Sequence, residues 1–127
     1  MKSHRPHRRE TIAFALATLA IATLTWAADT PKIDLSGADA ARGKEIAMDR
    51  GKGNCIACHL IPGGESPGAI GPALVAMQTR YPNKEALAVQ IWDATVKAPE
   101  AAMPPFGRHE ILTKQEFADV VEYIWSL

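Results

Sequence analysis

The sequence has few cysteines. Only two of its 127 residues are cysteines, Cys55 and Cys58, and they stand three positions apart. A pair this close cannot join distant segments, so a disulfide framework is excluded, although small exported domains commonly depend on one. A chain of about 100 residues buries only part of its surface on folding and gains from an additional stabilising element. That element must be something other than a disulfide.

The sequence also has no excess of basic residues. Its 14 lysines and arginines balance 14 aspartates and glutamates. Four of the basic residues but only one acidic residue precede position 28, so the remainder is slightly acidic. Nucleic-acid binding depends on basic side chains that neutralise phosphates. We therefore expect no nucleic-acid partner, whereas a protein partner is compatible with this composition.

Residues 1–27 have the pattern of an export signal. Basic residues dominate the first ten positions, and the run TIAFALATLAIATLTWA at 11–27 carries no charge. This run is short for a membrane span, which needs about 20 residues. Small residues flank Trp26 near the expected cleavage point. We predict cleavage after Ala27 and a periplasmic protein that is free of the membrane, with an uncleaved anchor as the alternative.

The two cysteines belong to the motif Cys55-Ile56-Ala57-Cys58-His59. This spacing is that of c-type haem attachment. Thiols three residues apart lie on one side of a helical turn and can both bond to the porphyrin, while the histidine that follows ligates the iron. The sequence therefore predicts one covalently bound haem c, held by Cys55, Cys58 and His59. The haem would also be the additional stabilising element.

Three other interpretations of the motif are weaker. A thioredoxin-like pair would stand in a βαβ context, and no run of β-branched residues appears near it. A zinc site would need a fourth ligand, and His109 is the only further histidine after residue 27. A plain disulfide would leave the adjacent His59 without a role.

Hydrophobic periodicity predicts three helices and no strand pairs. We expect the helices at about residues 39–49, 83–94 and 113–127. The last is the clearest, because Thr113 and Glu116 can form a capping box and apolar residues recur at three- and four-residue steps. Its expected partner is the first helix, where Gly43 either permits a close crossing or lies on the surface. The predicted fold class is all-α.

The segment after the haem motif is rich in glycine and proline. Seven of the 11 residues from Pro62 to Pro72 are of these two types, which excludes helix and strand. Because the segment begins three residues after His59, we expect it to run along the edge of the haem, where glycines allow close backbone approach. A mobile surface loop is the alternative.

A haem iron bound by one histidine has a second axial position. The candidates to fill it after residue 27 are Met48, Met77, Met103 and His109. Met48 is expected in the core, and Met77 lies only 18 residues beyond His59. Met103 precedes two prolines that impose a non-helical backbone, which suits a ligand that must not move. Met103 is the best candidate, with His109 and an open or Met77-ligated iron as alternatives. A His/Met iron without a vacancy favours electron transfer over substrate binding.

Four stretches resemble the SoxX subunits of the SoxAX cytochromes of bacterial sulfur oxidation. They are KGNCIACH, IPGGESPGAIGPAL, MPPFGRHEILT and VVEYIWSL. The block from Met103 to Leu112 is the most specific, because the haem motif and GPAL are shared by many cytochromes c. The resemblance implies a small cytochrome c fold over residues 39–127, with helices and Gly/Pro-rich loops around one haem. Residues 28–38 would form a lead segment after the signal.

The resemblance also implies roles for individual residues. Cys55 and Cys58 would be the thioether sites, His59 the proximal ligand and Met103 the distal ligand of the iron. The carbonyl of Pro72 would accept a hydrogen bond from the His59 ring and so set its tautomer and orientation.

SoxAX complexes are understood to join thiosulfate oxidatively to a cysteine of a carrier protein. The SoxA subunit holds the catalytic cysteine, and SoxX accepts electrons. The resemblance therefore implies a SoxA-type partner, a soluble cytochrome as electron acceptor and no catalysis by this chain alone, which has no thiol outside the haem motif. A free electron-shuttle cytochrome c and a haem catalyst with an open site are the alternatives.

Overall fold

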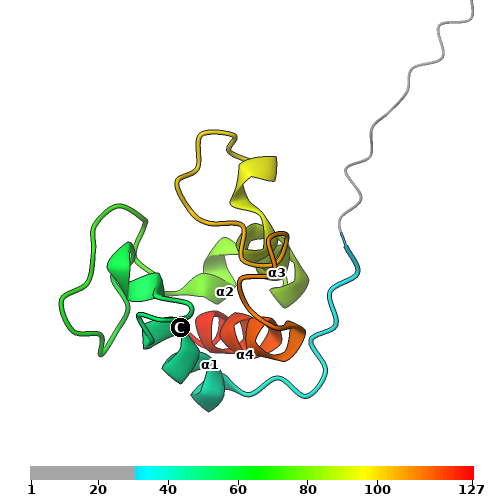
Figure 1. Ribbon diagram of the computed structural model, residues 1–127, viewed down its shortest axis with the longest axis horizontal. Coiled ribbons are helices and arrows are strands. Elements are labelled where there is room, and N and C mark those ends of the chain that lie inside the picture. The colour runs from blue at the N-terminus through cyan, green and yellow to red at the C-terminus, as the bar shows by residue number, and fades with distance from the viewer. Residues whose placement is uncertain (1–30) are drawn as a thin grey trace, which may run out of the picture.

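The computed structural model describes residues 31–127, so the expected signal at 1–27 and the start of the lead segment lie outside the described residues. The described part forms helices α1 (Ala40–Met48), α2 (Met77–Arg80), α3 (Lys84–Trp92) and α4 (Lys114–Trp125), with 3-10 turns η1 (Cys55–Ala57) and η2 (Ala94–Val96). Figure 1 shows that long loops connect these elements. No strand occurs within residues 31–127, so the predicted all-α class is confirmed.

The three predicted helices begin at residues that cap them. The Asp39 carboxylate accepts from two backbone N–H groups in the first turn of α1, and the Asn83 amide oxygen accepts from the Ala86 N–H in the first turn of α3. At α4, Thr113 and Glu116 form the expected capping box. These side chains satisfy N–H groups that have no partner inside the helix. The sequence therefore predicted the starts of all three helices correctly.

Helices α1 and α4 lie side by side and cross closely (Figure 1). The crossing occurs at Gly43, which is buried. A Cβ atom on Gly43 would lie 1.9 Å from the backbone oxygen of Asp119 and 2.9 Å from the Cβ of Tyr123. No side chain fits in that space. Of the two interpretations of Gly43, the close crossing is the correct one.

A buried carboxylate links α4 to the start of α1. Asp119 is only 2% exposed. Its oxygens accept hydrogen bonds from Arg42 Nε (2.8 Å), Arg42 Nη2 (2.9 Å), the Asp39 N–H (2.8 Å) and Gln115 Nε2 (3.0 Å). Burial alone would raise the pKa of Asp119, but the hydrogen bonds from Arg42, Gln115 and the Asp39 N–H outweigh it, so the pKa lies below its ordinary value. Asp119 therefore remains charged and paired at neutral pH.

The remaining elements pack around α4. The predicted hydrophobic face of α4 is buried, and the Trp92 ring at the end of α3 meets the Phe117 ring edge-on, with centroids 5.6 Å apart. Met48, which was expected in the core, is half-buried at its margin. The short helix α2 was not predicted. Across residues 31–127, no helix combines the length and hydrophobicity needed to cross a bilayer.

Candidate cofactor site

A cavity of about 560 Å³ opens between η1, α3, α4 and the loop that precedes α4. Its volume is in the range typical of cofactor and ligand pockets. Most of its wall is apolar. The hydrophobic side chains that line it include Leu74, Leu87, Ile91, Phe106, Val120 and Ile124.

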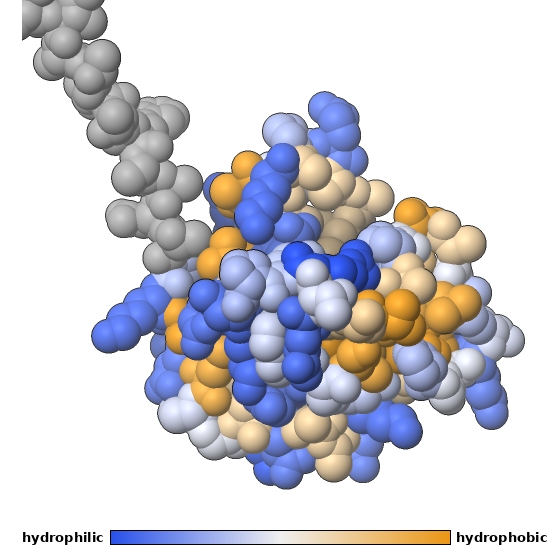
Figure 2. All heavy atoms as spheres, turned by 180° about the vertical axis from the view of Figure 1, so that it is seen from behind, coloured by the Kyte–Doolittle hydropathy of each residue, from blue (hydrophilic) through white to orange (hydrophobic). Residues whose placement is uncertain are grey.

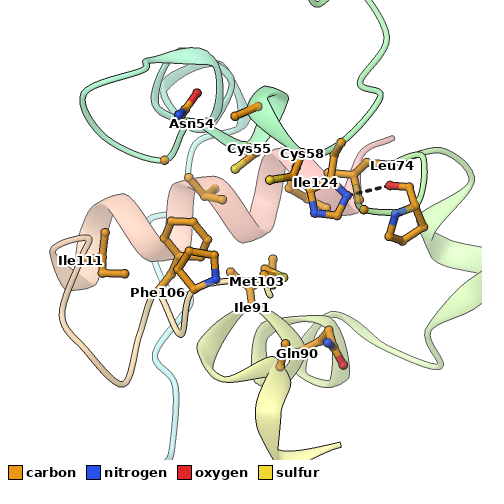
Figure 3. A pocket seen from close by; sticks show the side chains of 18 of the residues that line it. Asn54, Cys55, Cys58, Leu74, Gln90, Ile91, Met103, Phe106, Ile111 and Ile124 are labelled. Atoms are coloured by element: carbon orange, nitrogen blue, oxygen red, sulfur yellow. Dashed lines mark hydrogen bonds between the residues drawn. The ribbon is translucent and has the colours of Figure 1, made fainter. Parts of the chain in front are cut away.

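The turn η1 brings both cysteines to this cavity. The N–H groups of Cys58 and His59 both donate to the Cys55 carbonyl oxygen, at 3.2 and 2.9 Å, so the motif closes into one tight turn. Cys55 and Cys58 are free thiols, half-buried, and both line the cavity. Figure 3 shows their sulfur atoms on the same side of it. This arrangement presents two thiols to a single bound group.

The properties of the thiols argue against the other interpretations of the motif. Burial raises the pKa of Cys55 to about 11, whereas a redox-active pair needs a thiolate of lowered pKa. The two thiols form no disulfide. Within residues 31–127, no group of three or more His, Cys, Asp and Glu side chains is arranged to hold a metal ion, so a zinc site finds no support there.

The orientation of the His59 ring is set by its neighbours. Its Nδ1 atom lies 2.7 Å from the carbonyl oxygen of Pro72. A carbonyl oxygen only accepts, so Nδ1 carries the proton and donates it. In the neutral imidazole the Nε2 atom then keeps its lone pair for a metal. Gly71 packs against the same ring, because a Cβ atom there would lie 2.4 Å from His59 Cε1.

The Gly/Pro-rich segment folds back against the cysteine turn. The Gly68 N–H donates to the Ile56 carbonyl oxygen at 2.8 Å, and a Cβ on Gly68 would lie 1.9 Å from the Ala57 oxygen. The segment borders the cavity through Ile70, Gly71 and Pro72. Ile70 is 76% exposed.

The outer face near this loop is partly hydrophobic. Hydrophobic residues cluster on the right of Figure 2, the side on which the Gly/Pro-rich loop lies. Leu60 and Val75, at either end of the loop, are also exposed. An apolar surface therefore lies next to the cavity.

Two of the four axial candidates line the cavity. These are Met103, which is half-buried, and Met77, which is buried and whose sulfur accepts from Arg80 Nη1 at 3.4 Å. Met48 and His109 do not line it, and His109 is exposed. In Figure 3, Met103 lies beside Ile91, across the cavity from Cys55 and Cys58.

The sequence profile of the cytochrome c family matches residues 40–127, which is most of the chain. The chain belongs to the cytochrome c family. This cytochrome c is similar to a chain in the crystal structure of SoxXA from P. pantotrophus, with 26% identity and a TM-score of 0.63. The match covers 70% of this chain and 81% of that chain. The predicted small cytochrome c fold and the resemblance to a SoxX-type cytochrome are thereby confirmed.

A curated relative is also similar to this cytochrome c. It is an uncharacterized lipoprotein of Aquifex aeolicus (strain VF5), 35% identical over 74 residues. The match covers 58% of this chain and 36% of the lipoprotein. This cytochrome c thus spans about a third of the length of the curated relative that it matches.

A cytochrome c domain implies a covalently bound haem c, and the residues at the cavity of this cytochrome c fit that group. The wall is apolar, two thiols from one turn face it, and an imidazole nitrogen with a free lone pair lies at its edge. Nitrogen and thioether donors are those that haem iron takes in electron-transfer cytochromes. His59, Met103 and Met77 offer them here.

Sequence reasoning missed two residues near the site of this cytochrome c. Asp93 is 2% exposed, and it accepts from Arg108 Nη1 at 2.8 Å, from Thr95 Oγ1 at 2.5 Å and from the Thr95 N–H at 3.0 Å. The hydrogen bonds from Thr95 and then Arg108 hold the pKa of Asp93 below its ordinary value. No motif in the sequence signals this pair, because an Asp and an Arg 15 residues apart are unremarkable until the chain folds.

Proposed function

We propose that this cytochrome c is the electron-accepting subunit of a periplasmic SoxAX-type complex that joins thiosulfate oxidatively to a cysteine of a carrier protein. The observation that carries the proposal is the similarity to a chain of the SoxXA structure over 70% of this chain. It is supported by a cavity at which two thiols, an imidazole and a thioether converge.

Within this proposal, Cys55 and Cys58 would bind the haem covalently, and His59 and Met103 would hold its iron. When bound, the haem supplies one-electron redox chemistry. The hydrogen bond from Nδ1 to the Pro72 oxygen would leave His59 Nε2 as the ligand atom and would raise its basicity. The soft thioether of Met103 would favour the reduced iron and so raise the potential, as an acceptor of electrons requires.

The division of labour follows from the balance of the reaction. Joining thiosulfate to a thiol forms one S–S bond and releases one proton and two electrons. The carrier protein supplies the thiol, and this chain, which has none outside the haem motif, would handle only the electrons. The resemblance to SoxAX complexes implies a further cysteine, one that handles sulfur, on the partner. We propose a SoxA-type cytochrome subunit as that partner. This cytochrome c would take the electrons one at a time and pass them to a soluble cytochrome.

The test is co-purification from the native periplasm. We expect a larger haem subunit with an additional cysteine to travel with this chain, and addition of thiosulfate with the carrier protein to reduce the haem. The matched control is the same preparation with the carrier cysteine blocked, which should abolish the reduction. Recovery of a lone monomer with a His/Met spectrum would instead favour a free electron-shuttle cytochrome.

A further inference from the structure

The loop that carries Met103 is tied to the end of α3. Four and five residues after the methionine, the N–H groups of Gly107 and Arg108 both donate to the Trp92 carbonyl oxygen at 3.2 Å. Arg108 then donates from Nη1 to the carboxylate of Asp93 at 2.8 Å. Backbone and side-chain contacts thus hold the same short stretch of the loop.

Asp93 is built to hold this arginine. It caps η2 through Thr95 while it pairs with Arg108, so one buried carboxylate joins α3, η2 and the Met103 loop. Arg108 itself is 65% exposed along its side chain and supplies the only cation bonded to Asp93 in the described residues. Removal of the arginine would leave a buried charge with neutral partners only, which is unfavourable.

The loop also packs on Trp92. A Cβ atom on Gly107 would lie 2.0 Å from Trp92 Cε3, so the loop backbone lies directly against the indole ring. The same ring also meets Phe117 of α4 edge-on. The loop therefore cannot move away from the cavity without breaking its contacts with α3.

We propose that Asp93 and Arg108 are positioning residues that keep the Met103 sulfur at the iron. The inference rests on the proposed ligation by Met103. An added ligand such as imidazole binds the ferric iron only in the fraction of molecules in which Met103 has left, and its apparent affinity is proportional to that fraction. Weakening the Asp93–Arg108 pair loosens the loop and increases the fraction.

The chain provides a matched control for this pair. Arg42 is 52% exposed and pairs with Asp119, which is 2% exposed, just as Arg108 pairs with Asp93. Arg42 and Asp119 join α1 to α4 and do not line the cavity. A substitution of Arg42 therefore removes the same kind of ion pair without touching the Met103 loop.

The experiment compares imidazole binding by ferric holoprotein of the Arg108→Gln and Arg42→Gln variants. We expect Arg108→Gln to raise the imidazole affinity by about tenfold, as the loss of a charged hydrogen bond would. Arg42→Gln should leave the imidazole affinity within about twofold of that of the unsubstituted protein, because distant sites that share no partners are nearly independent. Arg108→Lys keeps the positive charge. We expect its imidazole affinity to lie much closer to that of the unsubstituted protein than to that of Arg108→Gln.

Equal effects of Arg108→Gln and Arg42→Gln, or no effect of Arg108→Gln, would overturn the inference, because a merely structural ion pair predicts no difference between them. If Arg108→Gln does not fold, Asp93→Asn replaces it, since the amide oxygen can still accept from Thr95. An unchanged imidazole affinity of Asp93→Asn would likewise overturn the inference. Met103→Ala tests the premise: if it binds imidazole no better than the unsubstituted protein, the ligation itself is wrong.

Discussion

Two methionines of this cytochrome c differ mainly in where they lie. Met103 and Met48 are both half-buried, but only Met103 lines the cavity. We expect Met103→Ala to open the iron, so that the ferrous protein binds carbon monoxide roughly 100-fold more tightly because no thioether competes for the position. Met48→Ala should leave binding unchanged. Optical titration with carbon monoxide measures both.

Met77 is the other methionine at the cavity, and its substitution decides whether Met77 or Met103 is the iron ligand. If Met77→Ala increased carbon monoxide binding and Met103→Ala did not, Met77 would be the ligand. Ready binding by the unsubstituted protein would indicate an open iron and favour a catalyst over an electron carrier.

The haem motif was evident from the sequence because its five residues are contiguous. The relation of Pro72 to His59 followed only from the resemblance, since the contact depends on how the intervening loop folds back. The structure brings the Pro72 oxygen to 2.7 Å from the ring. The contact of Gly71 with the same ring had no sequence signal, because a glycine in a glycine-rich loop does not stand out.

At the scale of elements, the close packing of α1 on α4 depends on Gly43. A methyl group there would meet the backbone of Asp119, which cannot rotate away as a side chain could. We expect Gly43→Ala to lower the free energy of unfolding by about 3 kcal/mol, the upper part of the range for overpacking. Urea denaturation followed by circular dichroism measures this. Lys44→Ala, at the exposed position next to it, should change the value by less than about 0.5 kcal/mol.

The first turn of α4 should make stability depend on pH. Lys52 Nζ lies 2.5 Å from Glu116 Oε1, and this contact, followed by those with Thr113, lowers the pKa of Glu116 to about 2. The unfolded chain binds that proton at about pH 4.3. The stabilisation is therefore present above about pH 5 and is lost as the pH falls towards 2.

The test of this pH dependence compares unfolding of the Glu116→Gln variant with that of the unsubstituted protein. We expect the unsubstituted protein to be the more stable at pH 6, to lose roughly half of that advantage by about pH 3 and to lose most of it by about pH 2. Other carboxylates titrate in both proteins and cancel in the difference. A difference that stays constant across this interval would show that Glu116 keeps its ordinary pKa.

Helix starts were predictable and short turns were not. Thr113 and Asn83 each precede a stretch with helical periodicity. A side chain that can cap a helix, placed directly before such a stretch, marks the start of the helix. Helix α2 has only four residues, too few for a periodic pattern to appear. Its one buried residue is Met77, and burial is a property of the folded chain.

At the scale of the whole molecule, part of the hydrophobic core faces the cavity. Its walls come from η1, α2, α3 and α4, so most elements turn apolar side chains towards it. We expect the Cys55→Ala, Cys58→Ala double variant, which cannot attach haem, to be largely disordered in circular dichroism. Native helix content in that variant would show that the protein core is sufficient by itself.

Fold class and cofactor could be predicted because they depend on local patterns, whereas the ionic links between segments could not. Arg42 and Asp119 are 77 residues apart. Either residue, taken alone, is an ordinary charged side chain on a helix. Their pairing exists only once α1 and α4 have met, so no window of the sequence contains it.

The packing of α1 on α4 has a consequence for the time course of biosynthesis. The first helix of the described chain finds its main partner only after residues 114–125 have been made. Contacts of such long sequence separation form late and slow folding. Until then we expect Cys55 and Cys58 to lie on an open chain, where both thiols are accessible. The topology thus leaves an interval after synthesis of the motif in which a haem can be attached before the protein closes around it.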